Sequence, residues 1–189
     1  MIMIFPSNFI IYDLEYTAWE GSLDRNWSGS GEYKEIIEIG AIAVNKSFKE
    51  VKSFSRLIAP TLNPVLSDYI INLTGITNKM ISNQSVTFKK GYLDFLYFIN
   101  KYAKIAFSYG NDRDVLMENI KMSGSNIDTK DTLFKNIRPY LEYKLNIPKN
   151  SVDSYLLNDY LNIESFNKAH RALGDCRCIL NAITHIKNI

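Results

Sequence analysis

The sequence is poor in cysteine and histidine, and this scarcity excludes several kinds of site. Its 189 residues include two cysteines, Cys176 and Cys178, and two histidines, His170 and His185. The cysteines are two positions apart in a predicted helix and therefore lie on different faces, so neither a disulfide nor a shared metal is expected between them. The chain also lacks the cluster of cysteine and histidine that zinc sites use. We predict reduced thiols with a packing role.

Long apolar runs and a strong charge of one sign are missing too. No apolar run approaches the roughly 18–20 residues of a membrane span, so no membrane partner is expected. The first residues lack the basic region and the cleavage site of a signal peptide, which favours the cytoplasm. The net charge of +2 does not indicate a nucleic-acid binder by itself. Residues 1–50 carry eight acids and four bases, and residues 51–189 carry twelve and eighteen; the basic part could supply phosphate contacts, or form an ordinary mixed-charge surface.

Neither repeats nor low-complexity tracts divide the chain. With 46% apolar and 22% charged residues, residues 1–189 suit a single globular domain with a sizeable core. The longest break is residues 20–34, whose three glycines and three serines predict a loop between strands.

The order of the predicted elements indicates an α/β domain. Residues 7–14, 35–44 and 51–59 are typical of strands and predict a three-stranded antiparallel meander. The pattern then changes to an alternation of short strands, at 103–109 and 127–129, with helices at 65–72, 87–101, 112–122, 133–143, 151–160 and 172–186. This order predicts a mixed five-stranded sheet flanked by helices.

Two carboxylates end the first apolar strand. Asp13 and Glu15 follow the run Phe-Ile-Ile-Tyr and, at positions i and i+2 of a strand, face the same side of the sheet. Like charges at this distance repel unless a cation lies between them, and a buried carboxylate is costly unless it is paired or binds a metal. The pair predicts a divalent metal site at the end of a central strand.

A third carboxylate is expected where a strand meets a helix. Asp112 follows the strand at 103–109, where a helix N-cap is the structural alternative. Asp114 is a rival candidate. We prefer Asp112 because Leu116 then lies one turn further along the same helical face and anchors it in the core.

The last helix brings a histidine and a fourth acid. On an ideal helix, residues five apart diverge by about 140°, so His170 and Asp175 face one site only if the histidine precedes the helix. Residues 165–169 allow such a loop. His185 lies inside the helix and is expected to be a surface or packing residue.

The combined pattern resembles the DEDDh group of 3′→5′ exonucleases, within the superfamily of RNase T and DnaQ-like exonucleases. Its motifs are Asp-x-Glu at a strand end, an acid at a strand-to-helix junction, and His followed five residues later by Asp. The Tyr-x-x-x-Asp of the tyrosine subgroup is absent. Residues 13–20, 63–69 and 73–77 are most similar to the branch that includes the histone-mRNA and small-RNA trimming exonucleases and their bacterial relatives. The resemblance covers nearly the whole chain.

The resemblance implies a ribonuclease-H-like fold and a two-metal hydrolase that acts on a nucleic-acid 3′ end, of RNA or single-stranded DNA. Asp13 would bridge two Mg²⁺ or Mn²⁺ ions, and Glu15, Asp112 and Asp175 would complete the ligand set, since hard cations prefer carboxylate oxygens. His170 would be the general base, a task that its ordinary pKa of about 6.5 suits. Nucleoside 5′-monophosphates would be released.

Contacts to the substrate are expected from residues around these motifs. The candidates are Leu14, Tyr16, Thr17, Trp19, Ile76, Lys168 and Arg171, with Trp27 as a further aromatic. Most have a structural alternative: Thr17 in a turn, Ile76 in the core, the aromatic residues packing the 20–34 loop, and the two bases exposed at the helix entry. Glu38, in an apolar strand, has no evident role.

Two other functions are compatible with these residues. One is a non-catalytic nucleic-acid-binding module on the same fold, which the presence of all four acids and the histidine argues against. The other is a small-molecule phosphodiesterase that uses the same metals. Relatives with this fold often form homodimers, although the sequence carries no dimer signature.

Overall fold

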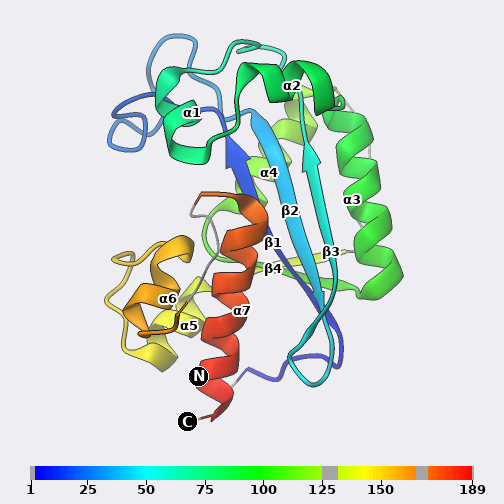
Figure 1. Ribbon diagram of the computed structural model, residues 1–189, viewed down its shortest axis with the longest axis vertical. Helices are drawn as coiled ribbons and strands as arrows, with labels where there is room; N and C mark the ends of the chain where they lie inside the picture. Colours follow the sequence, from blue (N-terminus) through cyan, green and yellow to red (C-terminus); the bar gives the residue numbers. More distant parts are fainter. Residues whose placement is uncertain (1–2, 125–131, 165–169, 189) are drawn as a thin grey trace.

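A five-stranded mixed sheet forms the centre of the computed structural model, which describes residues 3–124, 132–164 and 170–188 (Figure 1). The strand order is β3-β2-β1-β4-β5. The first three strands are antiparallel, and β4 and β5 are added in parallel to β1. Their bounds are β1 Phe9–Tyr16, β2 Ile36–Val44, β3 Glu50–Leu57, β4 Ile105–Ser108 and β5 Leu133–Asn136. The predicted α/β class and mixed sheet are confirmed.

Helices cover both faces of the sheet because β1 is apolar on both sides. Side chains of a strand alternate between faces. Ile10 and Tyr12 pack with α3 (Phe88–Tyr102) and α4 (Asp112–Met122) on one face. Phe9 and Ile11 pack on the other, with the helices α5 (Arg138–Leu145), α6 (Leu157–Tyr160) and α7 (Ala172–Asn188). The same alternation places Asp13 and Glu15 on the α7 face.

A third apolar cluster lies beside the end of β1. It is built around α1 (Asp68–Thr74) and α2 (Asn78–Gln84), which begin after the capping side chains of Ser67 and Thr77. Ile70 of α1, Ile81 of α2 and Ile37 of β2 meet in this cluster. It fixes α1 close to the loop that follows β1.

Some predicted elements differ from those observed. The strand predicted at 127–129 lies outside the described residues. Leu133–Asn136 form β5 instead of starting a helix, because pairing with β4 overrides local helical pattern. The helix α5 starts at Arg138, where Pro139 suits a first turn. The region 151–160 splits into a short 3₁₀ helix, η1 (Ser154–Leu156), and α6, while α2 was not predicted.

The two cysteines, Cys176 and Cys178, lie in the core. Both cysteine side chains are buried in the core on the α7 face, in agreement with the predicted packing role. Across the parts of the chain that the structure describes, no helix combines the length and the apolar character needed to cross a membrane.

Candidate active site

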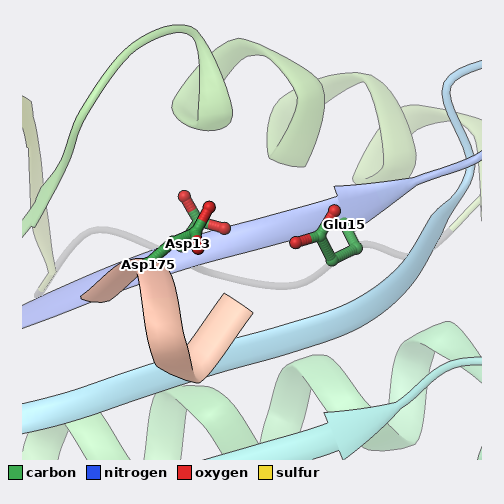
Figure 2. A group of neighbouring side chains, drawn as sticks. All are labelled: Asp13, Glu15 and Asp175. Atoms are coloured by element: carbon green, nitrogen blue, oxygen red, sulfur yellow. The ribbon is translucent and has the colours of Figure 1, made fainter. Parts of the chain in front are cut away.

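Three buried carboxylates meet on the α7 face of the sheet. Asp13 and Glu15 come from β1, and Asp175 comes from the first turn of α7 (Figure 2). Each offers an oxygen, and these oxygens all lie within 4.8 Å of one another. The three side chains are 6%, 8% and 4% exposed. In Figure 2, Asp175 reaches from the helix toward Asp13, and Glu15 lies further along the strand.

A glycine on β2 allows the first turn of α7 to come this close. Gly40 is the partner of Asp13 in the β1–β2 register. A Cβ atom at Gly40 would lie 2.6 Å from the backbone carbon of Ala172 and from the nitrogen of Leu173. Only glycine permits such an approach of helix to strand. The absence of a side chain at this position therefore brings Asp175 over Asp13.

A fourth carboxylate comes from the start of α4. The Asp112 Oδ1 atom accepts a hydrogen bond from the Leu14 backbone N–H at 3.2 Å, which ties this helix to β1. Asp112 is 8% exposed, whereas the side chain of Asp114 is 70% exposed and pairs with Arg113. Of the two rival acids, Asp112 is the one that lies beside the three-carboxylate group.

Burial raises the pKa of all four acids, and repulsion by neighbouring acids adds to the rise for Asp13, Glu15 and Asp175. For Asp13, burial and then the charge of Asp112 hold the pKa well above its ordinary value, and for Glu15 burial and then Asp175 do the same. Burial raises the pKa of Asp112 to about 7 and that of Asp175 to about 7, against opposing hydrogen bonds. The cluster is therefore short of positive charge.

Two oxygen atoms of the cluster indicate that its residues fit a divalent cation. Glu15 Oε1 and Asp175 Oδ1 are buried and have no hydrogen-bond partner among the described residues. A buried carboxylate oxygen is costly in this state, and a hard divalent cation would supply both the charge and the ligand. The donor set thus fits Mg²⁺ or Mn²⁺.

The histidine lies in a turn directly before α7, as the sequence predicted. His170 has a backbone φ of 53° and α7 begins at Ala172. Its ring lies 4.0 Å from the ring of Tyr155, centroid to centroid. Partial burial lowers the pKa of His170 below its ordinary value, although the charge of Asp153 opposes this shift. The neutral imidazole, which can accept a proton, is favoured.

The carboxylates and the histidine line one cleft of about 440 Å³. On one side it is bounded by the loop after β1 and by α1, with the apolar or aromatic side chains of Tyr16, Trp27, Tyr69 and Leu73. The other side is polar and is formed by Gly110, Asn111, Arg138 and residues 153–155. Figure 1 shows α1 and α5 on opposite sides of the start of α7. With a divalent cation held by the carboxylates, the cleft could take a ligand with an apolar end and an anionic centre.

A family model described as "Exonuclease" matches residues 10–183. The chain belongs to this exonuclease family. The identification made from the motifs is thereby confirmed, and the presence of a nuclease domain follows from it.

Three known proteins illustrate the similarity. ERI1 exoribonuclease 2 from Xenopus laevis is 35% identical over 75 residues, which are 39% of this chain and 10% of the frog protein. The 3'-5' exonuclease Snipper from Drosophila melanogaster is 36% identical over 80 residues, 41% of this chain and 27% of the fly protein. The nuclease domain of 3'hExo, a DEDDh family member bound to rAMP, has a TM-score of 0.79 at 20% identity and covers 96% of this chain and 92% of its own. The matched segments thus span only small parts of the two curated relatives.

Several side chains predicted to contact a substrate are placed elsewhere. Ile76 is fully buried in the cluster around α1, so it has no access to a ligand. The Thr17 hydroxyl donates to the Tyr33 carbonyl and accepts from the Glu35 N–H, and its side chain is buried. Trp19 is not among the residues that line the cleft, whereas Leu14 and Tyr16 are. Lys168 lies outside the described residues.

Arg171 has a structural partner in place of the predicted phosphate. Its Nε and Nη2 atoms donate to the two oxygens of Glu38 at 2.9 and 2.8 Å. Glu38 also accepts from the Ser55 hydroxyl at 3.0 Å and the Ala172 N–H at 3.3 Å. This pair explains the buried acid on β2. It also fixes the junction between His170 and α7.

Other cleft residues were missed by sequence reasoning. Ser154 donates to Asp175 Oδ2 at 3.2 Å, and Tyr155 contacts His170. Tyr69 comes from α1, and Asn111 and Arg138 from the polar side of the cleft. No spacing in the sequence relates these residues to the carboxylates, because the fold alone brings them together.

Proposed function

We propose that the chain is a metal-dependent 3′→5′ exonuclease that hydrolyses the terminal phosphodiester bond of RNA or single-stranded DNA. The observation that carries the proposal is the group of Asp13, Glu15 and Asp175, whose oxygens lie within 4.8 Å of one another in a cleft that also contains a half-buried histidine. Membership of the exonuclease family supports it. The names of the frog and fly relatives, and the rAMP bound to 3'hExo, support the polarity and a ribonucleotide end.

Asp13, Glu15, Asp112 and Asp175 would hold two ions of Mg²⁺ or Mn²⁺. Two such ions, when bound, neutralise phosphate charge and stabilise the attacking and the leaving oxygen. The oxygens of Glu15 and Asp175 that lack hydrogen-bond partners among the described residues support this assignment. The contact of Ser154 with Asp175 also supports this assignment. Its hydroxyl donates to one oxygen of Asp175 and leaves the other available for a metal ion.

His170 would act as the general base. Burial favours its neutral form, which can remove a proton from the attacking water. The ring of Tyr155 limits the orientations open to the imidazole. The neighbouring Arg171–Glu38 pair holds the backbone of this turn in place, with His170 at a positive φ.

The apolar side of the cleft would receive the terminal nucleoside. Tyr16 and Trp27 lie with ring centroids 5.6 Å apart, and Leu73 also lines the cleft. Stacking of a base on an aromatic side chain contributes about 1–3 kcal/mol without reading its sequence. Broad acceptance of 3′-terminal bases is the expected consequence.

Digestion of matched single- and double-stranded RNA and DNA oligonucleotides tests the proposal. With Mn²⁺ present, we expect 3′-labelled strands to lose nucleoside 5′-monophosphates, identified by mass, one at a time. Asp112→Asn should abolish this release, and Asp114→Asn, its exposed neighbour, should not. Intact oligonucleotides together with cleaved nitrophenyl thymidine phosphate would indicate a small-molecule phosphodiesterase. Binding without any cleavage would indicate a non-catalytic module.

Two further expectations accompany this function. Homodimerisation and a cytoplasmic location stay predictions. Size-exclusion chromatography with light scattering and imaging of the tagged full-length protein would test them separately from the activity.

A further inference from the structure

A second groove adjoins the active-site cleft. It has a volume of about 640 Å³ and lies along α5 and the loop that follows it, and we call it the α5 groove. Gly110, Asn111 and Arg138 line both the cleft and the α5 groove. Asp112 comes directly after this shared wall. The two depressions therefore adjoin at these three residues, beside the carboxylates.

The lining of the α5 groove suits a single nucleic-acid strand. Tyr143 is 62% exposed and presents an aromatic ring, and the exposed Lys149 belongs to the same lining. The acid of the groove, Glu142, is already engaged by Arg138 Nε at 2.7 Å and by the Asn150 N–H at 2.8 Å. An exposed lysine and an exposed ring, with the acid neutralised, match a phosphate followed by a base.

The two sides of the cleft set the direction of the strand. A 3′-terminal nucleoside on the apolar side, near Trp27 and Leu73, places its phosphate at the carboxylates. The rest of the strand then has to leave across the polar side, past Gly110 and Asn111. Gly110, with φ of 131°, has no side chain to obstruct this passage. The α5 groove lies directly beyond it.

We infer that the α5 groove binds the nucleotides on the 5′ side of the scissile phosphate, with Lys149 on a backbone phosphate and Tyr143 stacked on a base. The inference rests on the proposed exonuclease function and deepens it. It assigns single-stranded nucleic acid longer than a dinucleotide as the preferred substrate. It also makes the length preference a property of the groove and not of the carboxylate site.

The length dependence of cleavage tests this inference. The readout is the ratio of kcat/KM for a hexanucleotide to kcat/KM for a dinucleotide of the same 3′ end. We expect Tyr143→Ala to lower this ratio by at least about fivefold, the equivalent of one lost stacking contact. Tyr97→Ala, a 70% exposed tyrosine on α3 across the sheet, is the matched control and should keep the wild-type ratio.

The salt dependence of binding tests the lysine separately. Affinity for a 5′-labelled hexanucleotide is measured by fluorescence anisotropy in EDTA, so that cleavage does not interfere. Loss of one phosphate contact should reduce the slope of log affinity against log salt by about 0.7. We expect this reduction for Lys149→Ala. Lys144→Ala, an exposed lysine of the last turn of α5 outside the groove lining, should show the wild-type slope.

The outcomes distinguish a failure of the inference about the α5 groove from a failure of the proposed exonuclease function. Cleavage by the wild type, with variant ratios and slopes equal to those of the controls, overturns the inference and leaves the exonuclease intact. A wild-type protein that neither binds nor cleaves any oligonucleotide overturns both. Circular dichroism and thermal unfolding establish that the variants, all at exposed positions, are folded.

Discussion

Two buried glutamates lie opposite each other in the sheet and differ completely in their surroundings. Glu15 of β1 and Glu38 of β2 are partners in the strand register, so their side chains share one face. Glu38 is surrounded by donors from Arg171, Ser55 and Ala172. Glu15 has acids as neighbours, and its Oε1 atom has no hydrogen-bond partner among the described residues.

The difference separates a carboxylate that stabilises the fold from one that serves a ligand. Glu38 is 1% exposed and Glu15 is 8% exposed, so burial alone does not distinguish them. The distinction lies in whether the protein supplies the compensating charge. Where it does not, folding stability is lost in the free protein and binding of a cation is favoured.

The largest expected effect comes from removing the uncompensated charge. Asp13→Asn or Glu15→Gln should lower kcat/KM by about 10³-fold or more, because several kcal/mol of transition-state stabilisation depend on the metals. The metal-free variant should unfold at an equal or higher temperature than the wild type, since a repulsion is removed. Cleavage assays and thermal unfolding measure the two effects. Activity retained above a few per cent would contradict the metal assignment.

The histidine next to this group should affect turnover more than binding. His170→Ala should reduce kcat by about 10²–10⁴-fold with little change in KM, as expected for a lost general base. The wild-type rate should fall at acid pH, below the ordinary histidine pKa of about 6.5, because burial lowers the pKa of His170 and only the neutral ring accepts a proton. At metal concentrations that saturate the site at every pH, the variant should lack this acid limb. An unchanged rate would remove His170 from the mechanism.

The stability of the metal-free protein should fall as the pH rises. The pKa of Asp112 and that of Asp175 are raised to about 7 in the folded state, above their ordinary values. The folded state therefore holds more protons than the unfolded chain, so stability is present at acid pH and is lost through neutrality. For one such group, the loss between about pH 5 and about pH 8 is about 2–3 kcal/mol. Thermal unfolding in EDTA measures it.

Metal should reverse this loss. If Mn²⁺ or Mg²⁺ binds this site in the folded state only, as proposed, it should raise the unfolding temperature, and more at about pH 8 than at about pH 5. The metal-free Glu15→Gln variant should show a shallower pH dependence. A wild-type unfolding temperature that rises with pH in EDTA would contradict the description of the cluster.

Breaking the Arg171–Glu38 pair should have the smallest effect of these changes, and the effect should appear mainly in folding stability. Glu38→Gln leaves Arg171 without its counter-charge, at a cost of about 1–2 kcal/mol after allowance for the 29% exposure of the arginine side chain. This corresponds to a fall in unfolding temperature of about 2–8 °C. Glu50→Gln is the matched control, because it breaks the Arg177–Glu50 pair between α7 and β3, whose side chains are 37% and 27% exposed. The control should change stability by less than about 1 kcal/mol.

Site residues could be predicted from the sequence where they lie within a single strand or next to a single helix. The Asp13 and Glu15 pair is recognisable because two positions of one strand share a face. The placement of His170 before α7 followed from helical geometry. Glu38 was noticed as an anomaly, but its partner lies 133 positions away at Arg171, and no local pattern joins them. Contacts between elements far apart in the sequence depend on how the elements pack, and the spacing of residues along the chain does not predict this packing.

The same limit applies to the fold. The three meander strands were predicted within two residues at each end, because their apolar patterns are long. The edge strand β5 has four residues, of which only Phe134 is buried, so its pattern was too weak to predict a strand. The helix α2 likewise has a single buried side chain, Ile81. Short elements with little apolar surface are determined by their neighbours.

The position of α7 has a consequence for the order in which the protein is made. The ribosome produces β1, with Asp13 and Glu15, long before the turn and the helix that carry His170 and Asp175. A nascent chain that ends before this turn has three of the four acids, lacks Asp175 and has no base. It cannot assemble the proposed site, however well its sheet has formed. If the proposed function holds, cleavage of nucleic acid near the translating ribosome is expected only after α7 has been made.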